Sequence, residues 1–152
     1  VLNAMGARVI YTDLQPNPKA ADGFRELPEL LRGSDIVSLH VPLTPDTGNL
    51  IDRQRLAMMR PGTILINTAR GGLVEQAALF ESLKSGHLGA AGLDVFATEP
   101  IPENEPLLKL DNVVVAPHLA WLTTGTLDRS VTVAVENCRR LVAGEPLMHR
   151  VV

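Results

Sequence analysis

The sequence has few of the residues that cross-link small domains or bind metals. Its 152 residues include one cysteine, Cys138, so no internal disulfide can form, and no Cys/His spacing suggests a zinc site. A chain without disulfides is typical of a reducing compartment, and we expect a cytoplasmic protein. Aromatic residues make up only 3% of the chain, so the core must be built from aliphatic side chains.

Long runs of one charge or of apolar residues are also missing. The net charge is −3 without a cluster of Lys and Arg, so nucleic acid is not an expected partner. No apolar stretch approaches the roughly 20 residues that span a bilayer, so no membrane partner is expected. Hydrophobic residues make up 45% and charged residues 20%, as in soluble globular proteins. The length fits one domain that can bury a core.

Short β-branched runs alternate with helical patterns along the chain. Five runs predict strands, at Arg8–Thr12, Asp35–Val41, Thr63–Asn67, Ala90–Val95 and Asn112–Ala116. They are nearly continuously apolar, which is typical of strands buried on both faces of a parallel sheet. Shorter helical patterns lie between them, at Leu27–Arg32, Arg53–Met59 and Glu75–Ser85. This order predicts an α/β fold with a doubly wound parallel sheet.

A longer helix is predicted from about Thr124 to Ala143, closed by Gly144. Its apolar residues recur every three or four positions, at Leu127, Val131, Val135 and Cys138. We therefore expect Cys138 to lie in the core. At 1.5 Å per residue the helix is roughly 30 Å long. It is longer than the other predicted helices, so we expect it to reach beyond the domain.

Two polar residues follow predicted strands at positions where α/β proteins bind ligands. Asp13 ends the first strand, where an acidic residue can bond both ribose hydroxyls of an adenosine or simply cap a turn. Arg70 follows the third strand, before two glycines. Its planar guanidinium can bind a carboxylate, although a surface arginine in a glycine turn would have the same pattern.

A carboxylate and an imidazole follow the next two predicted strands. Asp94 ends the fourth strand and Glu99 comes five residues later, while His118 follows the fifth. A carboxylate can orient an imidazole, and such a histidine can deliver or remove a proton near neutral pH. An ordinary loop histidine remains the alternative for His118. His40, at the end of the second strand, is interpreted as structural or as lining a cofactor cleft.

Taken together, these segments resemble the NAD-binding domain of the D-isomer-specific 2-hydroxyacid dehydrogenases. The matching stretches are HVPLTPDTGNLI, MRPGTILINTARGGLVEQAAL and GAAGLDVFATEPIPENEPLLKLDNVVVAPHLAW, together with the helix that follows them. These long motifs run in the family's order from about residue 5 to the end of the chain. The resemblance implies a Rossmann-like fold, NAD as cofactor, a small 2-keto or 2-hydroxy acid as substrate and, by analogy, a homodimer.

The resemblance also implies roles for individual residues. Arg70 would hold the substrate carboxylate and the reacting oxygen, His118 would be the acid–base, and Glu99 would be its partner. Asp94 would bond the nicotinamide carboxamide, and Asp13 the adenine ribose. Further residues are expected along the cofactor cleft: His40, Val41, Pro42, Thr47, Thr68, Ala69 and Ala120.

Two positions bear on the substrate. Ala120 and Trp121 after the histidine resemble the glycerate dehydrogenase/hydroxypyruvate reductase branch of the family. Formate dehydrogenases of this superfamily have Gln where Glu99 stands, so formate is disfavoured.

The departures from the family pattern concern what the chain does not contain. By the resemblance, we expect the first strand and the glycine-rich phosphate loop to precede Val1, and we expect the substrate domain to lie outside these 152 residues. We therefore expect an incomplete NAD-binding domain, the larger C-terminal part of one. Two alternatives stay open. One is an NAD-sensing corepressor of the same fold, which would keep the Arg, Glu and His. The other is a nonfunctional remnant.

Without the phosphate loop and the substrate domain, residues 1–152 alone are expected to bind NAD poorly and to be inactive. Isothermal titration of the purified chain with NADH measures this directly. An affinity in the micromolar range would show that the phosphate loop is not needed and that the expectation is wrong.

Overall fold

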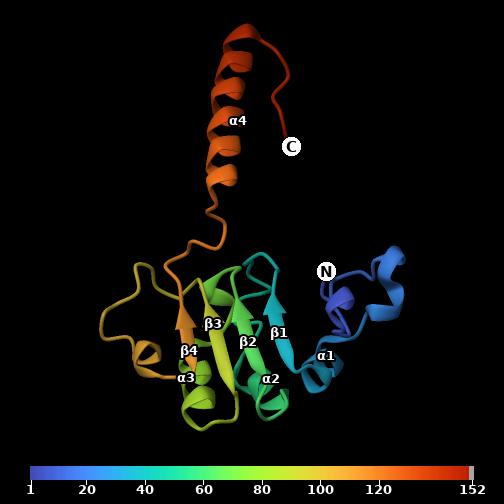
Figure 1. The fold of residues 1–152 in the computed structure, drawn as a ribbon, viewed down its shortest axis with the longest axis vertical. Coiled ribbons are helices and arrows are strands. Elements are labelled where there is room, and N and C mark those ends of the chain that lie inside the picture. Colours follow the sequence, from blue (N-terminus) through green and yellow to red (C-terminus); the bar gives the residue numbers. More distant parts are fainter. Residues whose placement is uncertain (151–152) are drawn as a thin grey trace. The chain divides into compact units, whose positions relative to one another are not determined.

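The structure, a computed structural model, describes residues 1–150 and divides the chain into two compact units (Figure 1). The first unit is Val1–Pro117, and the second begins at His118. No helix within residues 1–150 is both long enough and apolar enough to cross a membrane.

The first unit is built on a four-stranded parallel sheet in the order β1-β2-β3-β4. The strands are β1 (Ile36–Leu39), β2 (Ile64–Asn67), β3 (Ala90–Leu93) and β4 (Val113–Val115). Helix α1 (Leu27–Gly33) precedes β1, α2 (Arg53–Met58) lies between β1 and β2, and α3 (Gln76–Lys84) lies between β2 and β3. The predicted α/β, Rossmann-like architecture is confirmed, and each of these elements begins and ends within two residues of its prediction.

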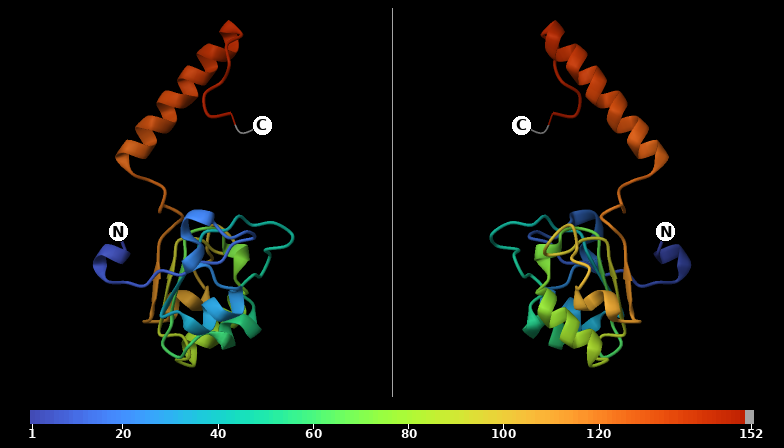
Figure 2. Two further views of the ribbon diagram at one scale, coloured as in Figure 1. Left: turned by 90° about the vertical axis from the view of Figure 1, so that its right-hand side faces the viewer. Right: turned by 90° about the vertical axis from the view of Figure 1, so that its left-hand side faces the viewer.

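The strands follow one another in the sheet in chain order, and connections between parallel strands are right-handed. The helices that connect them therefore lie on the same face of the sheet. Figure 2 shows α1, α2 and α3 together on that face. Side chains on alternate strand positions, such as Val37, Leu65 and Ala91, point into the core beneath them. The remaining positions of β2 and β3 are half-buried, and the outer strands are more open, with Ile36 61% and Val114 75% exposed. The prediction that every strand is buried on both faces is therefore wrong for the described chain.

The predicted first strand, Arg8–Thr12, is not a strand in the structure. Its only ladder contact among the described residues is a parallel bridge between Tyr11 and Phe24, whose rings meet edge to face. The chain leading to Phe24 is a 3-10 stretch, η2 (Pro18–Gly23), so only one residue pair can align. Asp13 therefore follows a single bridge and not a strand. The other short helical turns are η1 (Asn3–Met5), η3 (Gly71–Leu73) and η4 (Pro106–Lys109).

The second unit contains the long helix α4 (Thr124–Ala143), at the predicted bounds. The Thr123 hydroxyl oxygen accepts the Thr126 N–H at 3.1 Å and caps its start, and Gly144, at φ 68°, ends it in the left-handed conformation. None of its residues is buried, and Cys138 is exposed. The prediction that Cys138 lies in the core is wrong, because none of the described side chains of this unit buries that side of the helix.

Ion pairs fold the chain after α4 back on the helix. The Glu136 carboxylate accepts from Arg139 at 2.9 Å and from Arg140 at 2.7 Å, and Arg139 also pairs with Glu145 at 2.7 Å. The hydrogen bonds from Arg139 and then Arg140 lower the pKa of Glu136 to about 2, against an ordinary value of 4.5. The side chains of the cluster are 31% to 54% exposed, so the cluster orders the helix end locally and does not support a buried core.

This cluster predicts a specific acid response of the α4 C-terminus. Because the pKa of Glu136 is lowered in the folded state, its contribution is present above the unfolded value of 4.5 and is lost as pH falls through about 2. The protection factor of the Glu145 N–H, which donates to the Arg140 carbonyl at 2.9 Å, should therefore fall only below that upper value, once exchange is corrected for its intrinsic pH dependence. In Glu136→Gln the protection should be weak at every pH; a titration identical to that of the unsubstituted chain would contradict the assignment.

Candidate functional site

The site residues predicted in the first unit, apart from Asp13, lie on three loops that leave the carboxyl ends of β1, β2 and β3. Residues 40–50 follow β1, residues 68–75 follow β2 and residues 94–100 follow β3. Parallel strands bring their carboxyl ends to one edge of the sheet, where open α/β folds bind their ligands. Hydrogen bonds within and between these loops hold the backbone that carries each side chain.

The loop that carries Arg70 is organised by Asn67, the last residue of β2. The Asn67 side chain is 1% exposed; its Oδ1 accepts the Ala69 N–H at 3.1 Å and its Nδ2 donates to the Arg70 carbonyl at 2.9 Å. The Arg70 backbone is extended and its side chain is exposed, with the guanidinium donating to the Ala69 carbonyl at 2.6 Å. Thr68 is exposed and Ala69 half-buried. The Arg70 guanidinium is therefore carried by a loop whose backbone the Asn67 side chain holds in place.

The loop after β3 carries both predicted carboxylates. Asp94 is 4% exposed, and its N–H donates to the Asn67 carbonyl at 3.0 Å. Glu99 is exposed, and its Oε1 accepts the Phe96 N–H at 2.9 Å, which folds the side chain over its own loop. The Ala97 N–H donates to the Gln76 side chain of α3 at 3.0 Å.

A direct backbone contact joins the Arg70 loop to the Glu99 loop. A Cβ atom added at Gly71 would overlap the carbonyl carbon and oxygen of Phe96 and the nitrogen of Ala97. Only glycine allows the two backbones to approach this closely. The residues on either side, Arg70 and the Asp94–Glu99 loop, are therefore held in one arrangement.

The loop after β1 is closed on itself by Thr47. The Thr47 hydroxyl donates to the Pro42 carbonyl at 2.7 Å and accepts the Thr44 N–H at 2.7 Å. Val41 packs against the core, whereas His40 is exposed with its Nε2 2.9 Å from the Ser38 hydroxyl.

Backbone hydrogen bonds then attach this loop to the Arg70 loop. The Asn49 N–H donates to the Gly72 carbonyl at 2.8 Å, and the Ile51 N–H donates to the Leu73 carbonyl at 2.8 Å. The structure therefore brings the predicted residues of all three strand ends onto one connected set of loops.

Three predicted residues lie apart from these loops in the chain. Asp13 is exposed and its Oδ1 accepts the Leu14 N–H at 2.7 Å. His118 and Ala120 belong to the second unit. His118 is half-buried with φ 56°, and its carbonyl accepts the Trp121 indole N–H at 3.0 Å. A positive φ outside glycine is uncommon and often marks a functional position.

Sequence reasoning gave no role to Asn67 or Gln76. A signal for the first was available: an asparagine that ends an apolar strand and precedes a glycine turn often bonds the backbone two residues on. Gln76 could not be recognised this way, because its partner, Ala97, lies 21 residues along the chain.

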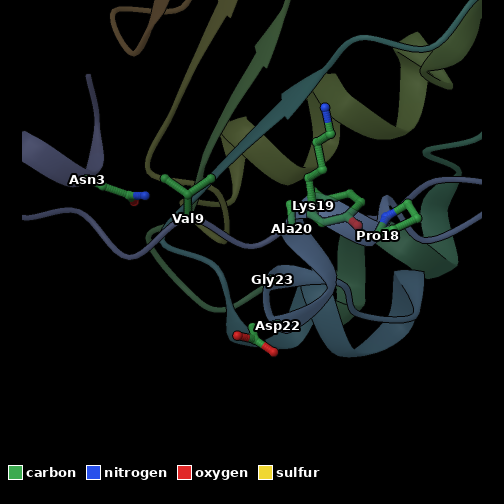
Figure 3. A pocket seen from close by; sticks show the side chains of 8 residues that line it. Asn3, Val9, Pro18, Lys19, Ala20, Asp22 and Gly23 are labelled. Carbon is green, nitrogen blue, oxygen red and sulfur yellow. The ribbon is translucent and has the colours of Figure 1, made fainter.

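A separate hollow lies in the N-terminal part of the first unit (Figure 3). It has a volume of about 420 Å³ and is lined by Asn3, Val9, Tyr11, Pro18, Lys19, Ala20, Asp22 and Gly23. None of the predicted site residues lines it, so it is not the cofactor cleft expected from the sequence.

The contact at Gly71 predicts the effect of a single methyl group. Gly71→Ala forces the Phe96 backbone away and should lower the free energy of unfolding by about 1–3 kcal/mol. Gly48→Ala is the matched control, because a Cβ there meets nothing closer than 3.8 Å and φ is not positive. Urea denaturation compares the two variants; equal stability would show that the loops separate without cost.

Comparison with known proteins gives consistent relatives. The family model described as "D-isomer specific 2-hydroxyacid dehydrogenase, NAD binding domain" matches residues 1–120. The D-3-phosphoglycerate dehydrogenase of Mycobacterium leprae is 47% identical over 93% of this chain and 28% of that protein. The glycerate dehydrogenase of Methylorubrum extorquens is 43% identical over 94% of this chain and 45% of that protein.

Solved structures agree with these relatives. The TT0316 protein from Thermus thermophilus superposes with a TM-score of 0.94 at 46% identity, covering 99% of this chain and 48% of that one. The D-lactate dehydrogenase with NAD+ from Lactobacillus jensenii gives 0.88 at 34% identity, covering 99% and 49%. The chain spans less than half the length of these relatives. It belongs to the NAD-binding domain family of the D-isomer-specific 2-hydroxyacid dehydrogenases.

Proposed function

We propose that the chain is the cofactor-binding part of an oxidoreductase that interconverts a 2-keto acid and its D-2-hydroxy acid. The observation that carries the proposal is the connected set of loops at the carboxyl ends of β1, β2 and β3. It holds Arg70 and the Asp94–Glu99 loop in one arrangement within a chain of this family. Because the relatives are more than twice as long, the activity is proposed for the whole protein.

The residues assigned to the cofactor have side chains that fit a dinucleotide. Asp94 offers a buried carboxylate that can accept a hydrogen bond from a carboxamide, and the exposed Asp13 can accept from ribose hydroxyls. Further residues are proposed to line the cofactor cleft: His40, Val41, Pro42, Thr47, Thr68, Ala69 and Ala120. When bound, NADH supplies the hydride.

Arg70, His118 and Glu99 are proposed to do the chemistry around the substrate. The Arg70 guanidinium binds the substrate carboxylate and polarises the neighbouring carbonyl, a charge-assisted contact worth roughly 1.5–3 kcal/mol. The protonated His118 imidazole, oriented by Glu99, delivers its proton to the carbonyl oxygen as the carbonyl carbon receives hydride. One hydride and one proton convert the keto acid to the hydroxy acid, and the reverse reaction returns the proton to His118.

Hydroxypyruvate and glycerate are the proposed substrate pair. The support is the Ala120-Trp121 pair after His118, together with the glycerate dehydrogenase among the relatives. The test is NADH oxidation by the complete protein with hydroxypyruvate, glyoxylate and pyruvate compared at equal concentration. The proposal requires the highest kcat/KM for hydroxypyruvate. NADH binding without turnover of any keto acid would instead favour an NAD-sensing binding protein.

Replacing the acid–base predicts a large loss of rate. In the complete protein, His118→Gln should lower kcat by about 10²- to 10⁴-fold, since the proton then has no positioned donor. His149→Gln is the matched control, because His149 is an exposed histidine with a similar φ of 53° in the same unit. Steady-state rates at saturating NADH and keto acid compare them; a His118 variant with an unchanged kcat would remove the histidine from the mechanism.

The choice between NADH and NADPH is proposed to depend on Asp13. Its carboxylate can bond both ribose hydroxyls and repels a 2′-phosphate, so Asp13→Ala should weaken NADH binding more than NADPH binding. Asp111→Ala, at another exposed aspartate, is the control. Calorimetric titration of the complete protein with each nucleotide gives the two changes in Kd, and equal changes would argue against this role.

A further inference from the structure

We propose that Asn67 is a positioning residue for the reaction, because its amide sets the loop that carries Arg70 while its backbone carbonyl holds Asp94. The inference rests on the proposed function, since it assigns Asn67 an effect on substrate and cofactor binding. It concerns a side chain that touches neither. Its support is the burial of Asn67 and the three hydrogen bonds that it makes.

Burial of an amide is costly unless both of its polar ends are bonded. Asn67 is 1% exposed, and each end has a partner within its own loop: Ala69 N–H at Oδ1 and Arg70 C=O at Nδ2. Only a side chain with an acceptor and a donor at this reach can bond both. An aspartate keeps the acceptor and loses the donor, whereas an alanine loses both.

The bond to the Arg70 carbonyl fixes the peptide between Arg70 and Gly71. That peptide sets the direction in which the Arg70 side chain leaves the loop. On its other side, Gly71 lies against the Phe96 backbone with no room for a Cβ atom. The peptide is therefore held between the Asn67 amide and the Phe96 carbonyl, and loss of the amide leaves one side unsupported.

The backbone of Asn67 reaches the neighbouring strand. Its carbonyl accepts the Asp94 N–H at 3.0 Å, directly after the pairing of Asn67 with Leu93 in the sheet register. One residue thus supports the proposed carboxylate anchor, Arg70, through its side chain and the proposed carboxamide anchor, Asp94, through its backbone. A side-chain substitution should disturb Arg70 first and leave the Asp94 contact in place.

The experiment compares Asn67→Asp and Asn67→Ala in the complete protein. Both lose the donor to the Arg70 carbonyl, so kcat/KM for the keto acid should fall by about 10²-fold in each, the cost of a small misplacement. The Kd for NADH should change by less than about threefold, because the carbonyl that holds Asp94 is retained. Amide exchange at Ala69, followed by NMR, should accelerate in Asn67→Ala and stay slow in Asn67→Asp.

Thr63→Val is the matched control on the same strand region. Thr63 is also 1% exposed, but it stands at the amino end of β2, where its hydroxyl donates to the Ser34 carbonyl at 3.1 Å. Loss of this hydrogen bond in Thr63→Val should lower Tm and leave kcat/KM near that of the unsubstituted protein. An equal loss of kcat/KM in Thr63→Val at equal loss of Tm would show general destabilisation and overturn the assignment.

Other outcomes are equally decisive. Full kcat/KM in Asn67→Asp would overturn the positioning role. If the unsubstituted protein reduces no keto acid, the proposed function fails. In that case the amide exchange rate of Ala69 still tests whether the Asn67 side chain holds the loop that carries Arg70. Unchanged exchange there in Asn67→Ala would overturn the inference as well.

Discussion

The contact between Gly71 and the Phe96 backbone is the constraint on which the geometry of the strand-end loops depends. It joins the loop after β2 to the loop after β3 without an intervening side chain. The contact sets the closest distance to which the two backbones can approach, and the hydrogen bond from the Asp94 N–H to the Asn67 carbonyl at 3.0 Å holds the two strand ends together. Arg70 and the Asp94–Glu99 loop therefore share one frame, which the sheet sets through β2 and β3.

Loops of this kind lose conformational entropy when they are ordered, by about 1–2 kcal/mol per residue of backbone. The structure offsets this cost with side-chain bonds made within or between the loops. Thr47 closes the loop after β1, Asn67 the loop after β2, and Gln76 holds the loop after β3. These three polar residues leave the exposed Arg70 side chain on an ordered backbone.

The sequence predicts those features of the fold that depend on neighbouring residues, and it fails for those that depend on distant parts of the chain. The strands and helices of the sheet were predicted to within two residues because apolar runs and caps are local patterns. Arg8–Thr12 has the same pattern, but within residues 1–150 it pairs only through the bridge of Tyr11 to Phe24, and a strand requires a partner along its length. The burial of Cys138 likewise depends on what covers its helix, which no local pattern encodes.

The residues around the candidate site also separate into those with a local sequence signal and those without one. The placement of Arg70 and Asp94 just after β2 and β3 could be predicted, because residues at strand carboxyl ends follow directly from the strand predictions. Gln76 bonds an amide 21 residues away, so its role depends on the folded arrangement. The open face of the sheet was missed for a related reason: apolar residues such as Ile36 stand there, and the sequence pattern cannot distinguish them from buried ones.

Two buried polar residues, one at each end of β2, use the same kind of side-chain hydrogen bond with different results. Thr63 just before the strand and Asn67 at its end are each 1% exposed, and Leu65 between them is fully buried. At both ends the chain leaves the ladder, so a side chain must bond a backbone group that the sheet no longer pairs. At the amino end this bond only holds Ser34. At the carboxyl end, where α/β folds bind ligands, the bond shapes the loop that carries Arg70, so the same kind of structural bond bears on the proposed site.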